Sequence, residues 1–143
     1  MKFWDASAIV PLILEEDSSR ACRALLRGDP LIVVWTLTQT EVLSALWRRH
    51  RNGGLDREAV RRAEARLQQL ALRWDEMDAL IAVRERAERL LRLHRLRAAV
   101  ALQLGAALLA VDDRARHRSF VALDESLLGA AEREGFTIIR PAS

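Results

Sequence analysis

The sequence predicts a single α/β domain of three layers (α/β/α), in which a central, mostly parallel sheet lies between helices. Short apolar runs alternate with longer segments of helical periodicity. That order is typical of parallel strands joined by helices that cover both faces of a sheet. The 143 residues show no repeat, low-complexity tract or linker, and this length suits one domain over residues 1–143.

The first half of the chain is predicted to hold two strands and four helices. Strands are expected over Lys2–Trp4 and Leu31–Trp35, the second being a continuous apolar run rich in β-branched residues, as in buried parallel strands. Helices are expected over Ser7–Leu14, Ser18–Arg27, Thr38–Arg51 and a segment capped by Asp56. Glycines after the second and third of these helices end them.

The second half is predicted to hold three helices and two strands. The expected elements are helices Asp78–Leu93 and Ala98–Ala110, strand Ser119–Leu123, helix Glu125–Glu134 and strand Thr137–Arg140. The short segment Trp74–Met77 has no clear pattern and stays unassigned.

Composition narrows the class of protein. Half of the residues are hydrophobic, which argues against a disordered chain, and Cys22 is the only cysteine, so no internal disulfide can form. The longest apolar stretches, such as Ala98–Val111, are shorter than the ~20 residues that span a bilayer, and the N-terminus lacks a signal-peptide profile. We therefore expect a cytoplasmic protein without a membrane partner.

The basic residues permit a nucleic-acid partner without requiring one. The net charge is +3, and every basic side chain other than Lys2 and the histidines is an arginine. Arginine binds phosphates in a bidentate way, but a codon bias in a GC-rich genome explains the same composition.

Three acidic residues are expected to meet at one edge of the sheet. Asp5 and Asp124 directly follow predicted strands. Glu41 lies one helical turn into the helix that follows the predicted strand Leu31–Trp35. Ligands bind outside the carboxyl ends of the strands in such sheets. Converging carboxylates repel each other unless a cation holds them, and oxygen ligands suit Mg²⁺ or Mn²⁺. Such ions activate water and stabilise the charge that develops when a phosphodiester is cut.

Each of these acids also has a simpler interpretation as a helix cap. Asp5 and Asp124 precede predicted helices, and the run from Thr38 to Glu41 has the pattern of a capping box. Capping and metal binding do not exclude each other. Other α/β chemistries lack their motifs, because the chain has no phosphate-binding loop, no dinucleotide fingerprint and no nucleophile elbow.

The acidic motifs resemble those of the PIN-domain family, specifically the VapC-like ribonuclease toxins of bacterial toxin–antitoxin pairs. The segments Phe3–Val10, Thr40–Leu46 and Phe120–Leu127 resemble the first, second and last motifs of that family, centred on Asp5, Glu41 and Asp124. The resemblance covers essentially the whole chain and keeps the order of the motifs. It implies a PIN-like fold.

The third motif departs from the family pattern at one position. The segment Leu96–Leu104 resembles this motif, but Val100 stands where the family has an aspartate that binds metal. Asp112 and Asp113 lie about three helical turns further along or in the next loop, too far to replace it. Two origins remain open for the valine: a natural, degenerate member that keeps its partner, or a chain altered or selected to lose a toxic activity by a change of one base.

The resemblance implies roles for the remaining residues. Asp5, Asp124 and Glu41 would be catalytic and would hold Mg²⁺ or Mn²⁺, and Ser7 would support them. The implied reaction is endoribonuclease cleavage, which we expect to be reduced or absent because of Val100. The alternative is a non-catalytic PIN-fold module that binds an antitoxin or RNA without cutting it.

Partners are also implied by the resemblance: a cognate antitoxin, an RNA of the tRNA or rRNA class, and a second copy of the chain in a homodimer. Arg48, Arg49 and Arg51 are the candidate RNA contacts, because they form a basic run about two turns beyond Glu41. A solvated helix face explains the same run.

Overall fold

A five-stranded sheet runs through the centre of the computed structural model, which describes residues 1–142. Its strands are β1 (Lys2–Trp4), β2 (Ile32–Trp35), β3 (Asp75–Met77), β4 (Ser119–Val121) and β5 (Thr137–Ile139). They lie in the order β3-β2-β1-β4-β5, and all four pairings are parallel. The predicted sheet is confirmed, and it is parallel throughout.

The structure adds β3 to the elements that the sequence predicted. This edge strand pairs with β2. The pairing continues past the end of β2, where the backbone nitrogen of Thr36 donates a hydrogen bond to the carbonyl of Met77. Its Asp75 and Glu76 are exposed, so the segment has no apolar run to reveal it in the sequence. Backbone pairing, rather than side-chain burial, defines this strand.

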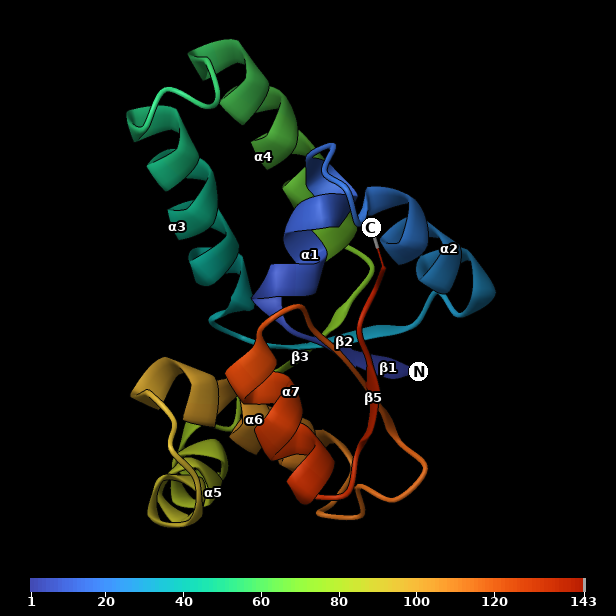
Figure 1. Ribbon diagram of the computed structural model, residues 1–143, viewed down its shortest axis with the longest axis vertical. Coiled ribbons are helices and arrows are strands. Elements are labelled where there is room, and N and C mark those ends of the chain that lie inside the picture. The colour runs from blue at the N-terminus through green and yellow to red at the C-terminus, as the bar shows by residue number, and fades with distance from the viewer. Residues whose placement is uncertain (143) are drawn as a thin grey trace.

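Seven helices cover the two faces of the sheet in the described chain (Figure 1). They are α1 (Ala6–Ile13), α2 (Ser19–Gly28), α3 (Thr38–Arg51), α4 (Arg57–Ala71), α5 (Leu80–Leu93), α6 (Ala98–Ala110) and α7 (Glu125–Arg133). Helices α1 to α4 lie on one side of the sheet and α5 to α7 on the other (Figure 1). This is the three-layer α/β/α arrangement that the sequence predicted.

The core has two halves because successive strand residues point to opposite faces. Phe3 and Val33 belong to the cluster under α5, α6 and α7, whereas Trp4 and Val34 belong to the cluster under α1 to α4. Every residue of β2 is buried, as expected for a strand covered on both faces.

Helices α5 and α6 pack very closely against each other. A Cβ atom on Gly105 of α6 would lie 2.9 Å from the backbone carbonyl of Val83 and 3.2 Å from the backbone nitrogen of Ala87. No single helix within residues 1–142 is long and apolar enough to cross a membrane, although α5 and α6 together, bent by 120°, meet that test on length and composition.

The strand order places a topological switch point beside β1. From β1 the chain builds outward to β2 and β3 on one side, and later to β4 and β5 on the other. Residues that follow the neighbouring strands β1 and β4 therefore meet at one edge, outside their carboxyl ends. Asp5 and Asp124 occupy those positions.

Candidate active site

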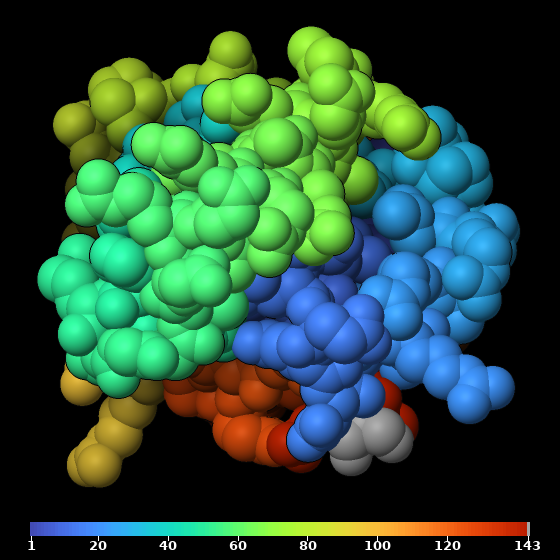
Figure 2. All heavy atoms as spheres, turned by 90° about the horizontal axis from the view of Figure 1, so that it is seen from above, coloured from blue at the N-terminus to red at the C-terminus, as the bar shows by residue number. Residues whose placement is uncertain are grey.

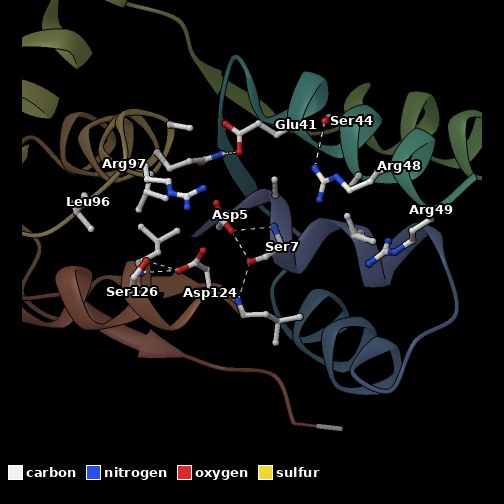
Figure 3. Close-up of a pocket in the computed structure, with 18 of the residues that line it drawn as sticks. Asp5, Ser7, Glu41, Ser44, Arg48, Arg49, Leu96, Arg97, Asp124 and Ser126 are labelled. Carbon is white, nitrogen blue, oxygen red and sulfur yellow. Dashed lines mark hydrogen bonds between the residues drawn. The ribbon is translucent and has the colours of Figure 1, made fainter. Parts of the chain in front are cut away.

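A cavity of about 1250 Å³ opens at this edge, and its lining includes all three predicted acids. Asp5 comes from the start of α1, Glu41 from α3 and Asp124 from the start of α7 (Figure 3). Glu16, which follows α1, is a fourth acidic residue in the lining and was not predicted. The acids thus gather in one cavity, as the sequence suggested.

Asp5 is held in place by Ser7. Its Oδ2 atom accepts hydrogen bonds from the Ser7 backbone nitrogen at 3.0 Å and from Ser7 Oγ at 2.5 Å. Ser7 Oγ in turn accepts a hydrogen bond from the Leu123 backbone nitrogen at 2.9 Å. Burial raises the pKa of Asp5, the bonds from Ser7 oppose that rise, and the charge of Asp124 adds to it. Ser7 therefore supports the carboxylate and links it to the loop before Asp124.

Asp124, the second aspartate of the cavity, is exposed. Its Oδ1 atom accepts hydrogen bonds from the Leu127 backbone nitrogen at 3.0 Å and from Ser126 Oγ at 2.8 Å. It is the N-cap of α7, as Asp5 is the N-cap of α1. The capping interpretation is correct for both residues, and both still line the cavity.

Glu41 does not close a capping box. The N-cap of α3 is Leu37, and no side chain caps this helix. The carboxylate of Glu41 instead accepts a hydrogen bond at 3.2 Å from Nε2 of Gln103, a buried residue of α6. Burial raises the pKa of Glu41 to about 7; the bond from Gln103 lowers it and the charge of Asp5 raises it further. A fraction of Glu41 is therefore protonated at neutral pH.

Val100 lines the same cavity as the three acids. It is partly buried, packs against the core beneath α5, α6 and α7, and offers no oxygen to a metal. Asp113 pairs with Arg86 at 2.6 Å, and neither it nor Asp112 lines the cavity. The position singled out by the sequence therefore lines the cavity together with the acids, and neither aspartate takes its place.

The donor set fits a divalent ion only in part. Carboxylates are suitable ligands for Mg²⁺ or Mn²⁺. However, no three Asp, Glu, His or Cys side chains within residues 1–142 are grouped closely enough to hold a metal ion. The charge of Asp124 raises the pKa of Asp5, while Gln103 of α6 donates a hydrogen bond to Glu41.

Four arginines also line the cavity: Arg48, Arg49, Arg95 and Arg97. Arg49 pairs with Glu16 at 2.7 Å, and Arg48 contacts Ser44 Oγ at 3.5 Å. Arg51, the third candidate RNA contact, is exposed near the end of α3 and does not line this cavity. Arg95 and Arg97 were missed, although their position beside the third motif was a signal for them.

A second, apolar groove of about 500 Å³ lies between α1, α2 and α4. Leu12, Leu26 and Leu70 are among its lining residues, and Arg23 and Arg73 are among its charged ones. Figure 2 shows the face of the molecule that carries these helices, with a hollow between α4 in green and α2 in light blue.

Comparison with known proteins identifies one family. The family model described as PIN domain matches residues 2–121, which includes Asp5, Glu41 and Val100. Asp124 lies three residues beyond the matched segment. A comparison with curated proteins found no match for this chain.

Proposed function

This chain belongs to the PIN domain family, and from that premise we propose that it is a metal-dependent endoribonuclease toxin of a toxin–antitoxin pair, with cleavage weakened or lost through Val100. Proteins with this domain are typically nucleases, so the fold is a nuclease fold. The toxin role, the RNA substrate and the impairment are the proposed part.

One observation supports the proposal most directly. Asp5, Glu41, Asp124 and Val100 come from four different helices or their caps, yet all line one cavity at the switch point of the sheet. The raised pKa values of Asp5 and Glu41 reflect carboxylates that are buried near other carboxylates, an arrangement typical of functional sites.

The residues that would hold a metal are Asp5 and Asp124, with Glu41 binding directly or through a water. When bound, the ion would activate a water and stabilise the developing charge on a phosphodiester. Ser7 orients Asp5 and fixes the loop that leads to Asp124. Gln103 orients Glu41. An absent carboxylate beside a divalent ion would weaken transition-state stabilisation by several kcal/mol, about 10²-fold or more in rate.

Restoring the missing carboxylate tests the proposal. RNA cleavage should be measured with Mg²⁺ and with Mn²⁺ for the chain itself, for Val100→Asp and for Val100→Asn. The asparagine variant is the matched control, because it has nearly the shape of aspartate without the charge. Cleavage that appears only in Val100→Asp and stops with EDTA is the expected result. Absence of cleavage in all three proteins would overturn the nuclease proposal.

A second candidate function is a non-catalytic PIN-fold module that binds an antitoxin or RNA. It is favoured by one observation: the carboxylates of the described chain form no group of three that could hold a metal. Binding of RNA or antitoxin by both the chain and Val100→Asp, with no cleavage by either, would establish this alternative.

The proposed antitoxin is expected to lay an amphipathic, acidic segment into the apolar groove between α1, α2 and α4. Leu12, Leu26 and Leu70 line the groove with Arg66 and Arg73. Arg23 also lines it but pairs with Glu15, whereas Arg73 forms no ion pair among the described residues, so an acidic partner would complement the groove. Loss of antitoxin binding in Leu26→Glu, with the RNA surface intact, is the expected outcome. The homodimer remains a proposal, and light scattering in solution tests it.

A further inference from the structure

The candidate active site is balanced in charge. Four carboxylates line the cavity, those of Asp5, Glu16, Glu41 and Asp124, and four guanidinium groups line it with them. A phosphate that enters the cavity therefore meets as many cations as anions. In a site of carboxylates alone, a divalent ion would have to offset the repulsion between the acids and a phosphate. Here the arginines of the chain supply that charge.

The arginines lie on two sides of the acids. Figure 3 shows Arg97 on one side of Asp5, with Arg48 and Arg49 on the other. Arg48 and Arg49 belong to the last turns of α3, whereas Arg95 and Arg97 belong to the link between α5 and α6. A strand that passes over the carboxylates would thus be held by its phosphates both before and after them.

Three of these arginines keep their guanidinium groups free of carboxylates, whereas Arg49 pairs with Glu16 at 2.7 Å and its Nη1 is buried without a hydrogen-bond partner in the described chain. Arg48, Arg95 and Arg97 form no ion pair with a carboxylate among residues 1–142, whereas Arg86 and Arg89 of α5 do. Unpaired guanidinium groups bind phosphates in a bidentate way without first giving up a partner.

The link that carries Arg95 and Arg97 is anchored directly before them. His94, which ends α5, has Nε2 at 2.8 Å from a carboxylate oxygen of Glu134 at the end of α7. Nε of Arg133 donates to Nδ1 of His94 at 3.3 Å, and Arg89 pairs with Glu134 at 2.6 Å. This cluster fixes the link relative to α7, the helix that Asp124 caps.

We propose that the cavity holds a single RNA strand by its phosphates, through Arg48 and Arg49 on one side and Arg95 and Arg97 on the other, and that this binding requires no divalent metal. The identity of the ligand as RNA rests on the proposed function; the use of the two arginine pairs rests on the geometry of the cavity. Val100 favours RNA binding without a metal, because an aspartate at this position would add a fifth carboxylate to the lining of the cavity.

The test measures binding and not cleavage. A labelled single-stranded RNA of mixed sequence is titrated with the protein in EDTA and in Mg²⁺, and fluorescence anisotropy is followed at several salt concentrations. The variants are the double substitution Arg95→Ala/Arg97→Ala and the control Arg57→Ala/Arg61→Ala. The control removes the same charge from exposed positions of α4 that do not line the cavity. Thermal unfolding verifies that all proteins are folded.

We expect the chain to bind RNA equally well in EDTA and in Mg²⁺. The Arg95→Ala/Arg97→Ala variant should raise Kd about tenfold and reduce the slope of log K against log salt by about 1.4, since each phosphate contact on a single strand contributes about 0.7. The control should change Kd less than about twofold, because it leaves the cavity contacts intact. In Val100→Asp, binding should weaken in EDTA and recover in Mg²⁺.

Several results would overturn the inference: no RNA binding in EDTA, equal weakening in the cavity and control variants, or an unchanged salt slope. These outcomes are separate from the test of the proposed function. Metal-dependent cleavage by Val100→Asp, with no contribution from Arg95 and Arg97 to binding, would leave the nuclease proposal standing and remove this one. Arginine-dependent binding with no cleavage by any variant would support the RNA-binding inference and overturn the nuclease proposal.

Discussion

Gln103 donates a hydrogen bond from Nε2 to Oε2 of Glu41 at 3.2 Å, which joins α6 to α3 beside the candidate active site. The same nitrogen lies 3.2 Å from Oγ1 of Thr38, and both Gln103 and Thr38 are buried. The two residues of the first bond are 62 positions apart in the sequence. The orientation of Glu41 is therefore set by a helix far from its own.

Removing this amide should cost stability and change the ionisation of Glu41. In Gln103→Leu, the buried Thr38 hydroxyl and the Glu41 carboxylate lose their donor, so the free energy of unfolding should fall by about 1–3 kcal/mol. The pKa of Glu41 should rise above its value of about 7, because the bond from Gln103 lowers it. Urea unfolding and an NMR titration of the carboxyl carbon measure the two effects. Gln69→Leu, an exposed change on α4, is the control and should alter stability by less than about 0.5 kcal/mol.

Glu41→Gln should stabilise the metal-free protein at high pH only. The pKa of Glu41 is raised from 4.5 to about 7 in the folded state, so the folded protein holds this proton more tightly than the unfolded chain does. Stability therefore falls as the pH rises from about 4.5 to about 7, and the penalty is complete above that range. Allowing for partial exposure, the variant should gain about 1–2 kcal/mol at pH 8. Unfolding at pH 4 serves as the internal control; a gain of equal size there would contradict the assignment.

Val100→Asp should make stability depend on Mg²⁺. In EDTA, the added carboxylate shares the cavity with Asp5 and Asp124, so this variant should be less stable than Val100→Asn. Mg²⁺ at about 100 times its Kd should add about 2.7 kcal/mol to the free energy of unfolding of Val100→Asp. The asparagine variant and the chain itself should respond much less. Thermal unfolding across a Mg²⁺ titration is the measurement, and an equal response of all three proteins would exclude a metal site at this position.

The same substitution at two glycines should have opposite effects. In Gly105→Ala, the new methyl group would lie 2.9 Å from a backbone atom of α5, so α5 and α6 must separate, and we expect a loss of about 1–3 kcal/mol. In Gly129→Ala, within α7, the nearest heavy atom is the flexible end of Arg133 at 3.5 Å. Alanine favours helix there, which should add about 0.5–1 kcal/mol. Urea unfolding of both variants tests the packing of α5 on α6, and equal changes in the two would contradict it.

The sequence predicted those parts of the fold that bury apolar side chains. The apolar run Leu31–Trp35 predicted β2 with an error of one residue at its start, because a parallel strand covered on both faces is apolar throughout. The segment of β3 could not be predicted in the same way. Its Asp75 and Glu76 are exposed, and only its pairing with β2 makes it a strand.

The candidate site was predicted where it depends on chain position and missed where it depends on tertiary contact. Asp5 and Asp124 follow strands that proved to be neighbours, so the position of each in the chain was enough. Glu41 also lines the cavity as predicted, but the alternative of a capping box is wrong, because Thr38 turns its hydroxyl to Gln103 of a distant helix. Arg95 and Arg97 lie beside the third motif, but their place in the cavity also depends on the link between α5 and α6, which the contact of His94 with Glu134 ties to α7.

The hydroxyl of Ser7 has a consequence for the order in which the molecule is made. It joins the Asp5 carboxylate to the Leu123 backbone, and β1 pairs with β4 along the same seam. Leu123 is therefore synthesised 116 residues after Ser7, its partner across the seam. At about 5–20 residues per second this delay is on the order of 6–24 s. A nascent chain that stops before β4 has the first acid without the cavity, so the site forms only after β4 and the start of α7 have been synthesised.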